Sequence, residues 1–212
     1  MTGRSRHRGI LVAVEGIDGT GKSTLVRSLA REIRRRGASV ALHREPSDPR
    51  LGRLAQEASV RDPWTGAVYF TVDRHLAAGA LRRALRQADV VLSDRSYFST
   101  LAYQGSALPA SDRQRLERIQ LESTVRPDRV LLVDLPVEEA LDRVGRRSER
   151  RAPLERRRTL ARVARAYRRL ARAPGWVVLD GRRPPRELVA DALRALGFDR
   201  PPSERRAGRG RR

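Results

Sequence analysis

The sequence of 212 residues contains no cysteine, which excludes disulfide bonds and metal sites built on thiolates. Its three histidines, His7, His43 and His75, lack the close and regular spacing of a zinc motif. Aromatic residues make up only 4% of the chain, so few side chains are available to stack on unpaired nucleic-acid bases. The N-terminal apolar run at 10–14 is too short for a signal-peptide core or a membrane span. These absences predict a cytoplasmic protein with no membrane partner.

Lysine is also nearly absent, because Lys22 is the only lysine among 46 lysine and arginine residues. The formal net charge of +21 raises the hypothesis of a polyanion partner. The arginines are spread along the whole chain, however, and such a bias can equally follow from genome composition. We therefore expect weak, nonspecific adhesion to nucleic acid at low salt and no specific nucleic-acid binding.

Five apolar runs rich in β-branched residues are typical of buried parallel strands. They span 10–14, 38–42, 90–92, 130–133 and 176–179. Segments with helical spacing of apolar residues lie between them, at 23–35, 76–85, 113–121, 137–144, 160–170 and 185–196. This alternation predicts an α/β fold in which helices cover both faces of a parallel sheet. Ligands of such sheets bind at the carboxyl ends of the strands.

The length favours one domain, which we place at 10–199 after a basic N-terminal extension at 1–9. The charged stretch at 143–158 is predicted to be more mobile than a core element. Residues 200–212 have no apolar periodicity, and we expect a disordered basic tail there.

The strongest motif lies at 16–23, which matches G-x-x-x-x-G-K-[S/T] between a predicted strand and a predicted helix. Its glycines let the backbone approach a phosphate, Lys22 reaches the β- and γ-oxygens, and the Ser23 hydroxyl ligates Mg²⁺. A lysine suits this position because it is a compact, flexible point charge. The motif predicts a P-loop that binds ATP and Mg²⁺. The nucleotide-contacting residues would be Gly16, Asp18, Gly19, Thr20, Gly21, Lys22, Ser23 and Thr24.

An acid and a base follow the predicted strand at 90–92. In a P-loop protein, Asp94 at this strand end is well placed to hold Mg²⁺ through water, and Arg95 can bridge donor and acceptor phosphates. An Asp-Arg pair at a strand end is often only a surface salt bridge. The P-loop favours the functional interpretation here.

With the strings Glu15 to Thr24, Arg44-Glu45-Pro46, Asp73-Arg74 and Asp94-Arg95 through Gly105, the chain resembles the thymidylate kinase family. The resemblance covers about residues 10 to 180. It implies a three-layer P-loop NTPase fold with a five-stranded parallel sheet, and transfer of phosphate from ATP-Mg²⁺ to dTMP, which gives dTDP. It also implies a homodimer.

The resemblance assigns roles to residues around the acceptor. Phe70 matches the aromatic that stacks on thymine, and Arg74, one helical turn later, matches the side chain that hydrogen-bonds thymine O4. Without the family, packing in the core is the simpler role for Phe70. Thr100 and Gln104 match residues that read the base edge. Tyr103 matches the ring that favours deoxyribose.

Three further residues match the family around the acceptor. Asp18 matches the loop acid near the acceptor 3′-hydroxyl. Glu45 and Pro46 match a turn that lines the acceptor pocket, where the peptide before Pro46 is a candidate cis bond.

The resemblance also identifies the lid at 143–158. Some members carry an arginine at the position of Gly19, whereas the bacterial type supplies this arginine from the lid. We assign it here to Arg147 and Arg151; a solvated charged loop is the alternative. The lid cluster comprises Arg143, Arg146, Arg147, Arg150 and Arg151.

The chain departs from the family pattern near the acceptor phosphate. Ser47 and Asp48 replace a glycine pair, and Gln56 replaces an arginine that helps to hold this phosphate. Arg53 lies three residues earlier and would share a face with position 56 if this segment is helical, so it is a candidate substitute. Ser96 stands where a tyrosine commonly follows the Asp-Arg pair.

The predicted mechanism is direct in-line transfer without a phosphoenzyme, in which Lys22, Arg95 and the lid arginines neutralise charge and lid closure excludes water. Two alternatives remain open. One is a P-loop kinase for another deoxynucleotide or a deoxynucleoside. The other is a catalytically inactive polyanion-binding protein, against which the intact Lys22, Ser23 and Asp94 argue.

Overall fold

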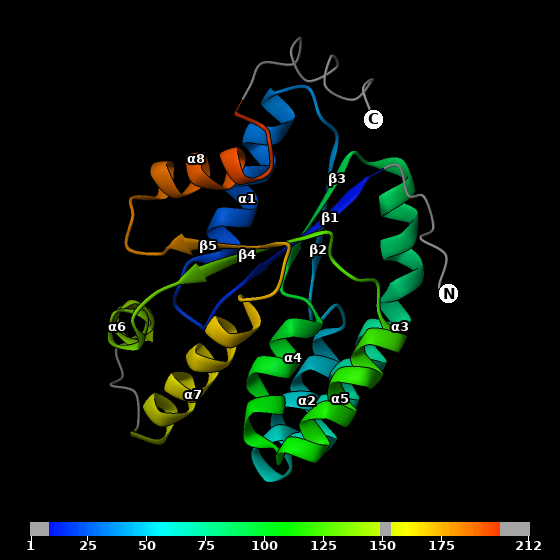
Figure 1. Cartoon of the computed structure of the whole chain (residues 1–212), viewed down its shortest axis with the longest axis vertical. Coiled ribbons are helices and arrows are strands. Elements are labelled where there is room, and N and C mark those ends of the chain that lie inside the picture. Colours follow the sequence, from blue (N-terminus) through cyan, green and yellow to red (C-terminus); the bar gives the residue numbers. More distant parts are fainter. Residues whose placement is uncertain (1–8, 149–153, 200–212) are drawn as a thin grey trace.

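The computed structural model describes residues 9–148 and 154–199, and its centre is a five-stranded parallel sheet with the order β2-β3-β1-β4-β5 (Figure 1). The predicted α/β class is confirmed. The strands are β1 (Ile10–Glu15), β2 (Val40–Arg44), β3 (Val90–Asp94), β4 (Arg129–Asp134) and β5 (Trp176–Asp180). Each lies within two residues of an expected apolar run. The predicted N-terminal extension, apart from Gly9, and the predicted tail lie outside the described residues.

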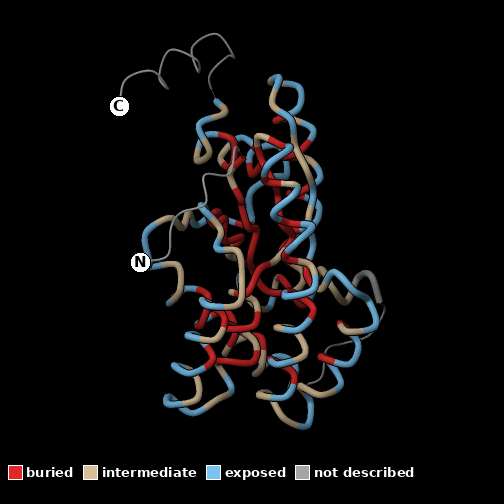
Figure 2. Tube along the Cα trace, turned by 90° about the vertical axis from the view of Figure 1, so that its right-hand side faces the viewer, coloured by how far each residue is buried: buried red, intermediate tan, exposed pale blue. Residues whose placement is uncertain are grey.

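Helices cover both faces of the sheet (Figure 1). On one face α1 (Lys22–Arg35) and α8 (Pro185–Ala195) pack on the strands and form the largest apolar cluster with them. The remaining helices are α2 (Pro49–Arg61), α3 (Pro63–Gln87), α4 (Tyr97–Tyr103), α5 (Ala110–Ser123), α6 (Val137–Ser148) and α7 (Leu154–Leu170). Figure 2 shows that burial is concentrated along the central strands. In β3 every residue is buried.

Two helices begin at the same pair of residue types. Asp48 accepts hydrogen bonds from two backbone N–H groups at the start of α2, and Asp62 does so at the start of α3. In both helices proline is the first residue, where its missing N–H and fixed φ are favourable. The Asp62–Pro63 start connects α2 directly to α3. The two helices pack closely together and both carry residues of the predicted acceptor pocket.

The predicted lid is more helical than expected. The helix predicted at 137–144 continues to Ser148, and the helix predicted at 160–170 begins already at Leu154. Arginine is a good helix former, so a charge run without apolar periodicity can still be helical. Residues 149–153 of the expected lid lie outside the described residues. No helix in the described part of the chain is long and apolar enough to span a membrane.

Candidate active site

The predicted P-loop connects β1 to α1 at the carboxyl edge of the sheet. Gly16 has φ +145°, and a Cβ there would lie 2.6 Å from the Val133 carbonyl oxygen, so the turn requires glycine. The Lys22 ammonium group donates a hydrogen bond to the Ile17 carbonyl at 2.8 Å, and only 6% of Lys22 is exposed. The lysine is thus held inside the loop, where it would face a bound phosphate.

Gly19 shows why this chain has no arginine in the loop. Its φ is +91°, and a Cβ at this position would lie 2.2 Å from the backbone oxygen of Ala140 on α6. Any side chain here would therefore require α6 to move. The lid arginine expected from the sequence stays a prediction.

The two predicted Mg²⁺ ligands lie next to each other. Ser23 Oγ donates a hydrogen bond to Asp94 Oδ2 at 2.5 Å, although 71 residues separate them. Among the described residues no group of three His, Cys, Asp or Glu side chains could enclose a metal ion. A hydroxyl and one carboxylate fit Mg²⁺, which retains several waters and takes further oxygens from substrate phosphates.

Arg95 joins the P-loop to the acceptor side. Its guanidinium donates to the Asp18 carboxylate and to Ser99 Oγ, the latter at 3.1 Å, and it lies 5.4 Å from the centre of the Tyr103 ring. Burial opposes ionisation of Asp18, but the charges of Arg95, Lys22 and Arg156 outweigh it and lower the pKa of this carboxyl. Asp18 therefore remains ionised at neutral pH.

Near Arg95 lies a buried carboxylate that was not selected as a site residue, although it begins a matched string. Glu15 is fully buried, and its Oε1 accepts hydrogen bonds at 2.7 Å from both the backbone N–H and the hydroxyl of Ser96. Its Oε2 accepts from Ser99 Oγ and from the Tyr167 hydroxyl, each at 2.8 Å. Burial raises the pKa of Glu15 despite these bonds. Ser96, which departs from the family pattern, thus donates two hydrogen bonds to this carboxylate.

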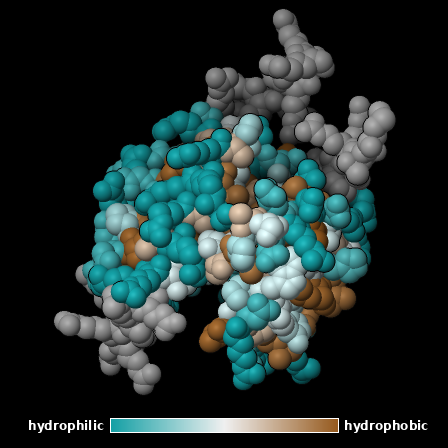
Figure 3. Space-filling model, turned by 60° about the horizontal axis from the view of Figure 1, so that its bottom comes forward, coloured by the Kyte–Doolittle hydropathy of each residue, from teal (hydrophilic) through white to brown (hydrophobic). Residues whose placement is uncertain are grey.

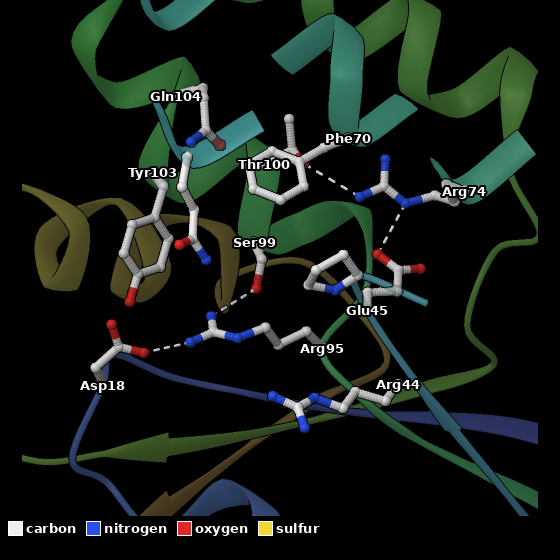
Figure 4. Close-up of a pocket in the computed structure, with 12 residues that line it drawn as sticks. Asp18, Arg44, Glu45, Phe70, Arg74, Arg95, Ser99, Thr100, Tyr103 and Gln104 are labelled. Carbon is white, nitrogen blue, oxygen red and sulfur yellow. Dashed lines mark hydrogen bonds and ion pairs between the residues drawn. The ribbon is translucent and has the colours of Figure 1, made fainter. Parts of the chain in front are cut away.

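A cavity of about 400 Å³ opens beside Arg95 (Figure 4). Its lining residues come from the P-loop, the end of β2, α2, α3 and the segment after β3. Seven of the eight other predicted acceptor residues lie here with Arg95, namely Glu45, Pro46, Phe70, Arg74, Thr100, Tyr103 and Gln104. Asp18 also lines the cavity, and the peptide between Glu45 and Pro46 is cis. The sequence strings therefore converge on one pocket.

Polar atoms in the cavity are positioned for a ligand. The Tyr103 hydroxyl is buried and has no hydrogen-bond partner in the described part of the chain, and burial raises its pKa to about 12. At neutral pH it is a protonated donor that a ligand oxygen would satisfy. Gln104 donates its amide N–H to Ser59 Oγ at 3.0 Å, and Ser59 donates to a backbone oxygen at 2.6 Å. The amide nitrogen of Gln104 therefore faces Ser59.

The eighth residue, Arg53, lies elsewhere. It lines a second groove, which Ser47 and Asp48 also line, and it is not among the lining residues of the first cavity. Gln56, three positions later, does line the cavity, so the two residues point into different spaces. A spacing of three residues indicated that Arg53 and Gln56 share a helix face, but it did not indicate that they line different cavities.

An arginine that was not selected as a site residue lines the cavity where Arg53 was expected. Arg44 ends β2 beside Asp94 in the parallel register, and its side chain lines the same end of the cavity as Arg95 (Figure 4). Its position directly before Glu45 in a matched string was the available signal.

The expected lid arginines are only partly described. The backbone of Arg147 belongs to α6, and Arg151 lies outside the described residues. Arg156, in the first turns of α7, was not selected from the sequence, yet its charge contributes to the lowered pKa of Asp18. Arg156 of α7 thus acts electrostatically on Asp18.

The lysine of the loop gives the site a pH dependence. Burial, together with the charge of Arg95, lowers the pKa of Lys22 to about 8, and the nearby acids only partly offset this. We expect kcat/KM for ATP to fall as the pH rises through about 8, because the free enzyme then loses the cation that binds phosphate. Initial rates between pH 7 and 9.5 measure this. Lys22→Arg should remove the break, since a guanidinium stays charged, whereas a flat wild-type profile would contradict the assignment.

Comparisons with known proteins agree with the geometry. The thymidylate kinase family model matches residues 14–192. The chain is 37% identical to "Thymidylate kinase" of Synechococcus sp. strain WH7803 over 198 residues, which cover 85% of this chain and 92% of that protein. It is 30% identical to "Probable thymidylate kinase 1" of Saccharolobus solfataricus over 187 residues, which cover 88% and 96%. The chain therefore belongs to the thymidylate kinase family.

Proposed function

We propose that this chain phosphorylates dTMP to dTDP by direct in-line transfer from ATP. The observation that supports this proposal is the path from the P-loop through Asp18 and Arg95 into a cavity that Phe70, Arg74 and Thr100 also line. The acceptor phosphate is already ionised near neutral pH and is itself the nucleophile. A strong general base is therefore unnecessary, in keeping with the absence of histidine from the lining of this cavity.

On the donor side, the P-loop amides bind phosphate oxygens and Lys22 places a positive charge beside the β- and γ-phosphates. Ser23 and Asp94 would hold Mg²⁺ through their adjacent oxygens. When bound, this ion neutralises charge that develops on the transferred group. Arg95 supplies a further positive charge between the donor and acceptor phosphates.

On the acceptor side, the family resemblance supplies the roles. Phe70 stacks on the thymine ring, Arg74 donates to O4, and Thr100 and Gln104 read the remaining base edge. Tyr103 crowds the 2′ position of the sugar. Asp18 lies near the 3′-hydroxyl, and Glu45 and Pro46 form one wall. The cavity volume of about 400 Å³ is within the range of small-ligand pockets.

We assign the acceptor phosphate to Arg44 in place of Arg53. Arg44→Met should raise the KM for dTMP by ten-fold or more while the KM for ATP changes little, because a charge-assisted bond to the acceptor phosphate is lost. Arg53→Met is the matched control, since Arg53 lines the other groove. Steady-state kinetics with each substrate varied measure this. A larger effect of Arg53→Met would restore the assignment made from the sequence.

A lid arginine completes the charge on the donor side. We place it in the cluster that contains Arg147 and Arg151, as in the bacterial type of the family. Two observations support this: Gly19 leaves no room for a loop arginine, and the charge of Arg156 already acts on Asp18. Lid closure also excludes water that would otherwise hydrolyse ATP.

A substrate panel tests the proposed function. ADP release is measured with dTMP, dUMP, dCMP, dGMP, AMP and thymidine as acceptors. The proposal requires dTMP to have the highest kcat/KM. Turnover of another acceptor without turnover of dTMP would establish a different P-loop kinase. Salt-sensitive DNA binding without any ATP turnover would establish the polyanion-binding alternative.

We also propose a homodimer through α3. Val68, Val72 and Leu76 lie on successive turns of this helix and are 49%, 43% and 70% exposed, and Leu54 and Val60 of α2 are exposed as well. Apolar side chains gather on one side of the space-filling view (Figure 3). Such a face on an arginine-rich surface fits a second copy of the chain. Light scattering should show a dimer that Val72→Asp converts to a monomer, whereas Val178→Asp, at an exposed site on β5, should leave it intact.

A further inference from the structure

Arg74 is held by three different acceptors at the base end of the cavity. Its Nε donates to Glu45 at 2.8 Å, one terminal nitrogen donates to Gln120 Oε1 at 2.5 Å, and the other donates to Thr100 Oγ1 at 3.1 Å (Figure 4 shows the contacts with Glu45 and Thr100). Only 5% of Arg74 is exposed. Of these acceptors, Gln120 is the one that does not line the cavity, so it acts on Arg74 from behind.

The orientation of the Gln120 amide is fixed by a chain of buried hydrogen bonds. Gln120 is fully buried on α5, and its Nε2 donates to Thr71 Oγ1 at 2.7 Å. Thr71 in turn donates to the backbone oxygen of Ala67 at 2.8 Å. A hydroxyl has a single proton and a backbone oxygen can only accept, so Thr71 must accept from Gln120. The amide nitrogen therefore faces Thr71 and the amide oxygen faces Arg74.

This fixed direction determines what Arg74 offers to a base. A guanidinium has five N–H donors on three nitrogens and no acceptor. In Arg74 each nitrogen already donates one N–H to a neighbour, which leaves two N–H groups. The remaining N–H groups can satisfy a keto oxygen such as O4 of thymine or uracil. They cannot satisfy the amino group that cytosine carries at the same position. A buried polar contact of this kind discriminates strongly, because the wrong base leaves donors unpaired.

We propose that Gln120 is a positioning residue that sets selectivity for a 4-keto pyrimidine, acting through Arg74 without touching the nucleotide. Thr71 belongs to the same device because it fixes the direction of the amide. The inference rests on the proposed function, since it takes Arg74 as the reader of the base. It adds that the selectivity originates in a residue of α5, outside the pocket.

The test compares acceptors that differ at one edge of the base. Because dUMP and dCMP both lack the 5-methyl group, their ratio of kcat/KM reports on the base edge, where uracil has a 4-keto oxygen and an N3–H and cytosine has a 4-amino group and an N3 acceptor. Gln120→Met keeps the length of the side chain but removes the acceptor for Arg74. We expect the dUMP/dCMP ratio to fall by ten-fold or more. The KM for ATP and the dTMP/dUMP ratio, which reports on the methyl group, should stay nearly constant.

Two variants separate positioning from a general loss of packing. Gln120→Glu retains an acceptor for Arg74 and should keep the dUMP/dCMP ratio within about three-fold of wild type. Gln114→Met makes the same replacement at an exposed position of α5 and should change none of these quantities. If Gln120→Met does not fold, Thr71→Val replaces it, because the freed amide can then rotate and the ratio should still fall.

A folded Gln120→Met or Thr71→Val protein with an unchanged dUMP/dCMP ratio would overturn the inference. So would a change in which the KM for ATP rises in proportion, because that would indicate a general disturbance of the fold. Failure of the proposed function gives a different result: the wild-type enzyme itself would then show no preference for dTMP over dCMP.

Discussion

Replacing Lys22 by alanine is expected to lower kcat by about a thousand-fold, because the variant loses the charge that stabilises the transferring phosphoryl group. Lys22 is 6% exposed, and its ammonium group is anchored on the Ile17 carbonyl inside the loop. Arg95, whose charge acts on Lys22, is already held by Asp18 and Ser99, so it offers no ready substitute. Steady-state and single-turnover rates of ADP formation measure the effect.

Lys22→Arg is the sharper control for this prediction. It keeps the charge but replaces a compact ammonium by a planar group that needs more room, and we expect a loss of at least a hundred-fold. The circular dichroism of both variants should match that of the wild type. A Lys22→Ala enzyme within ten-fold of wild-type kcat would remove Lys22 from the mechanism.

The sheet was predictable from sequence because its central strands are buried on both faces. The apolar runs nevertheless ended one or two residues before the carboxyl ends of several strands. Here β1, β2 and β3 end in Glu15, Arg44 and Asp94, which are charged. These ends face ligands in a parallel sheet, so the strand signal fades where the functional site begins.

The long helix α3 was only partly predictable. The expected segment 76–85 covers its second half, whereas the first half has apolar side chains on more than one side. Ala67 is buried in the core, but Val68 and Val72 are about half exposed. A helix that presents apolar residues to both its own core and a second surface has no clear apolar stripe, so its periodicity is lost.

The residues proposed to contact nucleotide were easier to find in the sequence than the residues that position them. The P-loop, Arg74 and Arg95 lie in recognisable strings. Gln120 lies 46 positions from Arg74 along the chain and supports it through a hydrogen bond between two helices. Glu15 begins a matched string, but its support of Arg95 runs through Ser99 and is visible only in the structure. No local pattern encodes such a partner, because a buried glutamine on an amphipathic helix looks like any polar position.

Replacing Arg95 by methionine is expected to lower kcat by about a hundred- to a thousand-fold, the range for loss of one preorganised charge at the transferring group. Arg95 is oriented on three sides, by Asp18, Ser99 and the Tyr103 ring. Because its charge acts between the two phosphates, the loss should appear mainly in kcat. The KM for ATP should change by only a few-fold.

Arg95→Lys and Ser99→Ala divide the contribution of Arg95 into charge and orientation. Lysine keeps the charge but cannot contact Asp18 and Ser99 simultaneously through a rigid fork, so most of the loss in kcat should persist. Ser99→Ala keeps the arginine but removes one of its anchors and one donor to Glu15, and a loss of about ten-fold in kcat is expected.

The variants Arg95→Met, Arg95→Lys and Ser99→Ala are compared with Arg44→Met, whose effect should lie in the KM for dTMP. If Arg95→Met raised only this KM and left kcat intact, Arg95 would bind the acceptor without assisting transfer, and Lys22 with the lid arginines would have to supply the charge at the transition state.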